Sequence, residues 1–178
     1  PELAQEWNAA KNTRKPTEIS RLSQYPVWWK GICGHEWKDK VFHRAVGGAG
    51  CIYCEKVFLK ELPYLLVTMY AKQYGLATRT DDEKLIGARI DAVIPELRLA
   101  FAFSQKGTDR EAKVAEVLHF LCKAKRIPLF VIRQKDPIAL ATEIKQAFAK
   151  ANLFINSDSQ RDVAHLRKRY FAQKNNGN

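Results

Sequence analysis

Two cysteines near the N-terminal end, Cys51 and Cys54, form a Cys-x-x-Cys pair, and a third cysteine and a histidine precede them. Cys33 and His35 lie roughly 15–20 residues before that pair, a separation typical of two knuckles that close around one metal ion. Sets of four thiolate and imidazole groups, arranged as a tetrahedron, are the ligands that zinc prefers. The neighbouring glycines favour this interpretation over free thiols in a small core, because tight knuckles need a permissive backbone. A Cys-x-His spacing is short for such a pair, so His43 is an alternative to His35.

A single acid in an apolar segment, Asp91, is the second candidate for chemistry. If Glu96 and Leu97 form a two-residue turn, Asp91 lies directly across from residue 102 on the next strand, where side chains are neighbours. Two carboxylates at those positions would hold Mg²⁺ beside a scissile phosphate, but the residue there is Ala102. An unpartnered Asp among apolar neighbours is costly, which favours a functional role for Asp91 over a structural one.

The pattern of apolar residues predicts the elements that carry these groups. Residues 1–55 are rich in Trp, Gly, Cys and His with little periodicity, as in a small metal-stabilised module. Residues 56–178 show regular helix and strand patterns, so we predict a domain boundary near Glu55. In the second part we expect a helix with Pro63 in its first turn, then strands over 85–94 and 98–104.

The remainder of the chain predicts two capped helices around a buried strand at 127–132, and a last, basic helix over 161–173. Thr108 and Glu111 form a capping box, and Asp136 opens the second helix. The first capped helix is expected to bury one face, made of Val114, Val117, Leu118, Leu121 and Cys122. This order of elements indicates an α/β fold, a mixed sheet flanked by helices.

The first part contains Leu3-Ala4-Gln5-Glu6-Trp7-Asn8, Trp28-Trp29-Lys30, Gly34-His35-Glu36-Trp37, Arg44 and Gly50-Cys51-x-Tyr53-Cys54. In these motifs, over roughly residues 2–54, it resembles the probable zinc-ribbon domain family. Members of that family often stand beside nuclease domains related to very-short-patch-repair endonucleases. The resemblance implies a treble-clef-like zinc ribbon. Two departures stand out: the family usually has Cys where Gly31 stands, and Pro where Ile52 stands. We expect Cys33 to take over the role of the missing cysteine.

The segment from Arg89 to Phe103 is similar to the PD-(D/E)xK nuclease superfamily, in its very-short-patch-repair-like branch. There an Asp begins the hairpin, and a Glu commonly follows about eleven residues later, where Ala102 stands here. Ser104 falls where the motif's Lys or Asp is expected, and Phe130-Val131-Ile132-Arg133 looks like the last core strand. The resemblance covers about residues 57–135. It implies a restriction-endonuclease-like fold with Mg²⁺ as the catalytic metal.

The same resemblance implies further site residues. Related nucleases often place an extra acid near the start of the first helix, where Glu61 stands; a charge facing solvent is the alternative. Lys106 or Lys113 could supply the lysine that Ser104 does not, since this superfamily tolerates migrated lysines; otherwise both are solvated. Ala102 leaves two possibilities open. Either a Glu was replaced there so that DNA is bound but not cut, or the natural protein lost cleavage and kept binding.

A net charge of +11 over 178 residues, with a pI near 9.6, indicates a polyanionic partner, and we expect DNA. The candidate phosphate contacts are Lys38, Lys40, Arg44, Arg167, Lys168 and Arg169. No stretch approaches the ~20 apolar residues of a membrane span. Cysteines that look like metal ligands rather than a disulfide framework predict a reducing, cytoplasmic compartment.

These features predict a metal-dependent DNA endonuclease, inactive or weakly active with Ala at position 102, whose structural zinc ribbon aids DNA binding. One alternative is a non-catalytic DNA-binding protein that retains the nuclease fold. Another is an adaptor within a larger mobile-element or restriction complex. Restoring Glu at position 102 separates the first two, and the salt dependence of DNA binding tests the third.

Overall fold

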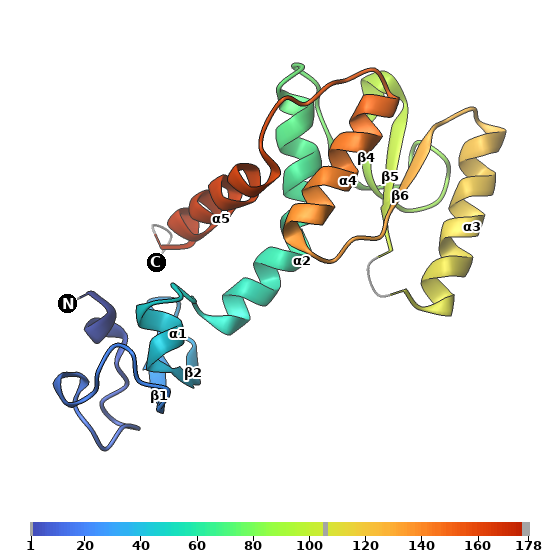
Figure 1. Cartoon of the computed structure of the whole chain (residues 1–178). Helices are drawn as coiled ribbons and strands as arrows, with labels where there is room; N and C mark the ends of the chain where they lie inside the picture. Colours follow the sequence, from blue (N-terminus) through green and yellow to red (C-terminus); the bar gives the residue numbers. More distant parts are fainter. Residues whose placement is uncertain (1, 105–106, 176–178) are drawn as a thin grey trace. The chain divides into compact units, whose positions relative to one another are not determined.

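The chain, described by a computed structural model over residues 2–104 and 107–175, divides into two compact units (Figure 1). The N-terminal unit comprises the residues up to Lys60 together with those from Arg169 onward. The α/β unit is Glu61–Lys168. Residue 55, where the composition changes, lies inside a helix. Among the described residues, no helix combines the length and apolar content that crossing a membrane requires.

The N-terminal unit is built on a two-stranded antiparallel hairpin, β1 (Pro26–Lys30) and β2 (Glu36–Lys40), in which Trp28 pairs with Lys38. A short helix α1 (Val41–Ala45) follows, and α2 (Ile52–Lys72) begins in this unit. Two 3-10 turns, Glu2–Glu6 and Pro16–Glu18, precede the hairpin. Side chains alternate along a strand, so every second residue of the hairpin faces inward. The buried cluster consists of Val27, Trp29, Trp37, Val41, Cys51 and Cys54.

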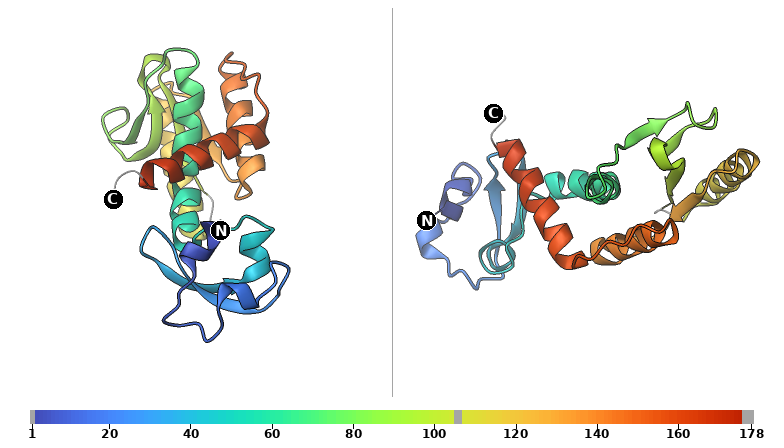
Figure 2. Two further views of the ribbon diagram at one scale, coloured as in Figure 1. Left: turned by 90° about the vertical axis from the view of Figure 1, so that its left-hand side faces the viewer. Right: turned by 90° about the horizontal axis from the view of Figure 1, so that it is seen from above.

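The α/β unit is a four-stranded mixed sheet in the order β3 (Arg79–Asp82), β4 (Ile90–Ile94), β5 (Leu99–Phe103), β6 (Leu129–Ile132). The first three strands are antiparallel, and β6 runs parallel to β5 after a crossover through α3 (Asp109–Ala124). Helix α3 packs on one face of the sheet, and α4 (Pro137–Lys150) packs on the other (Figures 1 and 2). The last helix, α5 (Ser159–Asn175), contributes residues to both units.

The hairpin of β4 and β5 has the predicted register. Ala92 pairs with Phe101 and Val93 with Ala100, and this register, continued one residue past the last pair, would set Asp91 against Ala102. The connection is not a two-residue turn, however. A 3-10 turn, Pro95–Leu97, is closed by Arg98 in the left-handed conformation with φ 51°. The two predicted caps are also confirmed: Thr108 with Glu111 opens α3, and Asp136 accepts two backbone N–H groups at the start of α4.

Two expectations about the elements were wrong, and one strand was not predicted. Residues 85–89 are not strand, because the chain turns there, with Gly87 at φ 79°, before β4 begins. The strand β3 was missed because its sequence, Arg79-Thr80-Asp81-Asp82, is polar and lies at the edge of the sheet, where all but Asp82 are exposed. Pro63 is not in a first turn but inside α2, because this helix already begins beside the second pair of cysteines.

The predicted inner face of α3 was only partly correct. Ala115, Leu118 and Cys122 are the residues buried against the sheet. Val114 and Val117 are exposed on the other side of the helix, together with Phe120. A helix with apolar residues on two sides offers two candidate inner faces, and sequence periodicity alone does not distinguish them.

Candidate functional site

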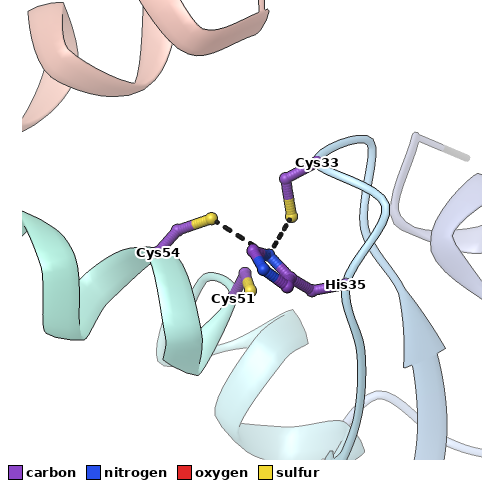
Figure 3. A group of neighbouring side chains, drawn as sticks. All are labelled: Cys33, His35, Cys51 and Cys54. Carbon is purple, nitrogen blue, oxygen red and sulfur yellow. Dashed lines mark hydrogen bonds between the residues drawn. The ribbon is translucent and has the colours of Figure 1, made fainter.

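Four side chains of the N-terminal unit converge on one point (Figure 3). The donor atoms of Cys33, His35, Cys51 and Cys54 all lie within 4.8 Å of one another. No other group of three or more potential ligand side chains of this kind occurs within residues 2–104 and 107–175. This is the ligand set predicted from the spacing of the cysteines.

Two structural elements position the four ligands. Cys33 and His35 lie on the tight turn between β1 and β2, where Gly34 has φ 77° and the Gly31 N–H donates to the His35 carbonyl. Cys51 immediately precedes α2, and Cys54 lies in its first turn, three residues later on the same side of the helix. A hairpin knuckle is thus brought against a helix N-terminus, where the helix dipole favours the negative charge of thiolates.

The imidazole presents its Nδ1 atom to the thiols. This nitrogen lies 3.3 Å from the Cys33 Sγ and 3.5 Å from the Cys54 Sγ, and the ring of Tyr53 packs against His35 at 5.2 Å between centroids. The alternative ligand, His43, is turned elsewhere, with its Nδ1 2.9 Å from an Asp39 carboxylate oxygen. His35 is therefore the fourth donor.

This donor set fits zinc. Three sulfurs and one imidazole nitrogen are soft or borderline ligands, which Mg²⁺ and Ca²⁺ do not favour. Four protein ligands complete a tetrahedron and leave no open position for a substrate, so a zinc held here is structural. What the metal supplies is a cross-link between the hairpin and the helix.

The thiols differ in acidity before metal binds. Burial, followed by hydrogen bonds with Cys33 and Cys51, raises the pKa of Cys54 to about 12. For Cys33, burial acts in the same direction, but hydrogen bonds to the backbone and ring of His35 outweigh it and lower its pKa. Because zinc binds thiolates, metal binding displaces protons, and the affinity for zinc decreases as the pH falls.

Arg44 belongs to the core around this site. Its guanidinium lies 5.1 Å from the ring centre of Trp29 and 4.8 Å from that of Trp37, and it forms an ion pair with Glu6. Only 7% of the residue is exposed. The expectation that Arg44 contacts phosphate is therefore corrected: cation–π contacts and an ion pair hold this side chain inside the unit.

The outer face of the β1–β2 hairpin is basic and exposed to solvent, in contrast to the buried surroundings of Arg44. Lys30, Lys38 and Lys40 are exposed there, and none of the three forms an ion pair within the described part of the chain. Trp28, half-buried, lies beside Lys38, and the Lys11 ammonium stands 4.6 Å above its ring. Glu36, the one acid of this face of the strands, is paired with Lys11 at 2.6 Å.

Comparison with known proteins agrees with the geometry of the N-terminal unit. Residues 3–57 match the family described as "Probable Treble clef zinc finger domain". That span contains the hairpin knuckle, the four ligands and the start of α2. The chain thus carries an N-terminal treble-clef zinc finger domain with a Cys₃His site. Neither the comparison with curated proteins nor that with solved structures gives a match.

Asp91, in the α/β unit, is half-buried near the start of β4. Its Oδ2 accepts a hydrogen bond of 2.7 Å from the Phe103 backbone N–H. Burial raises its pKa above the ordinary 3.8, and the Phe103 hydrogen bond offsets this only in part. Tyr64 of α2 lies close enough that burial, together with the charge of Asp91, raises the pKa of its phenol to about 12.

The other residues predicted for a nuclease site belong to different elements of the chain. Glu61 is exposed on α2, Lys113 is exposed on α3, and the Ser104 N–H donates to the Ile132 carbonyl at the sheet. Lys106 lies outside the described residues. Sequence reasoning missed Tyr64 as a neighbour of Asp91, because their proximity depends on how α2 crosses the sheet. It also missed the outward position of Trp28, which strand alternation beside Trp29 could have indicated.

The raised pKa of Asp91 predicts a dependence of stability on pH. A carboxyl with a higher pKa in the folded than in the unfolded state binds its proton more tightly when folded. The ionised Asp91 therefore lowers the free energy of unfolding at pH values above the raised pKa, and it has no such effect well below pH 3.8.

The variant Asp91→Asn removes the charge and keeps an oxygen that accepts from the Phe103 N–H. We expect this variant to have a higher Tm than the parent at neutral pH, with an advantage that shrinks as the pH falls. Melting curves over a pH series measure it, and a difference independent of pH would contradict it.

Proposed function

We propose that this chain is a DNA-binding protein with the architecture of a PD-(D/E)xK nuclease and an incomplete site for the catalytic metal. The observation that carries DNA binding is the outer face of the β1–β2 hairpin, where exposed lysines stand together on the zinc-stabilised unit. The one glutamate of that face is already paired with Lys11. A polyanion such as the DNA backbone is the partner that this charge complements.

The hairpin suits contact with phosphates rather than with base edges. Lysine is a point charge on a flexible stem, which holds phosphate without reading sequence. Trp28 is covered by Lys11 and half-buried, so it supports the lysines rather than offering a free stacking surface. We expect this face to add affinity and little sequence preference.

Helix α5 offers a second basic segment, the run Arg167, Lys168 and Arg169, of which the last two are exposed. Its first turn is anchored within the α/β unit by Asp162, whose Oδ2 accepts hydrogen bonds from Tyr70 and Ser157 and lies 2.8 Å from the Lys145 ammonium. A helix so anchored holds its charges at a defined place within its own unit, which supports a separate contact with DNA phosphates.

The nuclease part of the proposal is supported by the α/β unit. The unit contains a mixed sheet flanked by helices, as the resemblance implies. After a helix come three antiparallel strands, a crossover helix and a fourth, parallel strand. An acid, Asp91, stands at the start of the hairpin, destabilised by burial and one residue beyond the last β4–β5 pair, Ala92 with Phe101, so that the same register continued would set it against position 102. Ala102 provides no second carboxylate, so we expect the chain to bind DNA and not to cut it.

Replacing Lys38 and Lys40 together with Ala tests the DNA-binding proposal. Each lysine that neutralises a phosphate releases a counterion, so log Kd plotted against log salt should flatten by about 1–2 units, with about tenfold weaker binding at moderate salt. The matched control is Lys56→Ala with Lys60→Ala, two exposed lysines on α2 in the same unit, which remove the same charge. Titration of a duplex at several salt concentrations measures both effects.

Equal losses in the two double variants would mean that net charge alone, and not this face, attracts DNA. No binding by the folded, zinc-loaded parent chain at low salt would contradict DNA binding altogether. That result would favour the role of an adaptor in a larger assembly.

A further inference from the structure

Two turns of the α/β unit carry exposed arginines in a backbone conformation that arginine rarely adopts. Arg98 closes the connection between β4 and β5, and Arg126 follows the end of α3. Their φ angles are 51° and 56°, in the left-handed region. In both turns the arginine N–H donates to the carbonyl three residues earlier, to Pro95 at 3.0 Å and to Lys123 at 3.1 Å. The two arginines therefore occupy equivalent places in two similar turns.

Both positions suit the backbone of glycine better than that of arginine. In the left-handed region a Cβ atom crowds the following carbonyl oxygen, and helices commonly end on glycine at the place that Arg126 holds. Asp81 and Asn152 also have positive φ, but short polar side chains enter this region more readily. Two bulky arginines there are backbone outliers of the kind that cluster at functional sites.

The two turns lie together and are joined by hydrogen bonds. The Arg98 Nη2 donates to the Lys125 carbonyl at 3.3 Å, and the Lys125 ammonium donates to the Leu85 carbonyl at 3.2 Å. The strands that follow the turns begin side by side, since Ala100 of β5 pairs with Leu129 of β6. Figure 1 shows the end of α3 and the β4–β5 connection at the same end of the unit. The positions of the basic side chains are thus fixed by the sheet and by α3.

The charge of these turns is strongly positive. Lys123 and Lys125 are exposed beside the two arginines, and none of the four cations belongs to an ion pair within the described part of the chain. Glu96 is the one acid in residues 95–98 and 123–126. The loop that Lys125 contacts carries Glu83 and Lys84, whose charges offset each other. The dipole of α3 favours cations at its own end, but it gives no reason for the arginine of the β4–β5 connection.

We propose that the four cations of these turns bind the phosphate backbone of DNA; the turn cluster is Arg98, Lys123, Lys125 and Arg126. The inference rests on the proposed DNA binding and adds a contact within the α/β unit. A guanidinium has five N–H donors and binds phosphate through pairs of them, so Arg98 keeps donors beyond the one bond it makes. Four cations against one carboxylate fit a partner with closely spaced negative charges.

The turn cluster is separate from the nuclease-like hairpin start. Asp91 lies near the start of β4, and the connection that carries Arg98 follows the end of the same strand. The cluster therefore adds affinity for DNA and takes no part in holding a metal beside Asp91. Like the lysines of the β1–β2 hairpin, it contacts phosphates and should add little sequence preference.

The double variant Arg98→Gly, Arg126→Gly separates a functional from a structural role of the two arginines. Glycine relieves the left-handed backbone, so we expect the α/β unit of this variant to melt at a higher temperature than that of the parent. Because two phosphate contacts are lost, DNA should bind about tenfold more weakly at moderate salt, and log Kd against log salt should flatten by about 1–2 units. Circular dichroism on heating and titration of a DNA duplex at several salt concentrations, both with the whole, zinc-loaded chain, measure the two effects.

The matched control is Lys72→Ala with Lys150→Ala, two exposed lysines in the last turns of α2 and α4, which remove the same charge from the same unit. This variant should bind DNA nearly as the parent does. Equal losses in the two double variants would mean that net charge alone attracts DNA. A glycine variant that binds like the parent would leave DNA binding to the other basic segments, and one that melts at a lower temperature would show that the arginines serve the fold. Each of these results overturns the role of the turn cluster, whereas a parent chain that does not bind DNA contradicts the proposed function and this inference with it.

Discussion

Removal of zinc is expected to unfold the N-terminal unit and to leave the α/β unit folded. The buried cluster of the N-terminal unit is small, and two of its members are themselves ligands, Cys51 and Cys54. Structural zinc contributes about 10–16 kcal/mol in apparent binding free energy, which is as large as the about 5–15 kcal/mol by which whole domains are typically stable. The α/β unit has its own core, centred on Val93, Ala100 and Leu118, and does not contain the zinc ligands.

The chain offers a specific optical probe for this experiment. All four tryptophans, Trp7, Trp28, Trp29 and Trp37, lie in the N-terminal unit. Treatment with a strong chelator should shift their fluorescence to the wavelength of solvent-exposed tryptophan, while most of the helical circular dichroism persists. Zinc added back should restore the spectrum.

Two cysteine variants give the matched control. Cys54→Ala should purify with far less than one equivalent of zinc and show the shifted fluorescence. Cys122→Ala removes the buried cysteine that lies outside the site, and should retain a full equivalent of zinc. A metal-free protein with unchanged tryptophan fluorescence would contradict a structural role for zinc.

Ala102→Glu is expected to convert a binding protein into a Mg²⁺-dependent nuclease. Cross-strand neighbours have Cβ atoms only ~5 Å apart, so a Glu at position 102 and Asp91 could share one hydrated cation beside a bound phosphate. Metal stabilisation of a phosphoryl transition state is worth several kcal/mol, so cleavage of a plasmid should increase by at least about two orders of magnitude. Asp91→Asn in the same background should abolish the gain.

The melting temperature of Ala102→Glu gives a second measurement that does not depend on DNA. Ala102 is buried in the cluster that α3 covers, so a Glu there should destabilise the protein in the presence of a chelator. Mg²⁺ or Mn²⁺ should recover part of that loss, and should leave the Tm of the parent unchanged. A destabilised, inactive variant that does not respond to metal would mean that Ala102 simply fills space in the sheet.

The features that could be predicted from sequence were those determined by local spacing. Cys51 and Cys54 are three residues apart, so any helix that starts beside them brings both sulfurs together. The register of Asp91 follows from the length of the connection and the alternation of apolar residues, and it did not depend on the type of turn. The caps of α3 and α4 involve residues within one helical turn of each other.

The features that could not be predicted depend on what lies across the fold. The edge strand β3 forms because β4 offers it hydrogen bonds, not because its own residues favour a strand. The burial of Arg44 requires two tryptophan rings and Glu6, which is 38 residues away along the chain. Pro63 is tolerated inside α2 although it lacks the N–H of a helix interior, a cost that tertiary packing must offset.

The glycine after Trp28-Trp29-Lys30 has a consequence for how such fingers diverge. A Cβ placed on Gly31 would lie 3.0 Å from the Cys33 Sγ, so the backbone at position 31 points toward the place where that sulfur now stands. Members of the family that the chain resembles usually have their cysteine at this position. The same thiolate thus reaches the metal from two residues further along the loop, and Gly31 leaves the room it occupies. On a turn this tight, a sulfur carried by residue 33 therefore reaches the place toward which a side chain at position 31 would point.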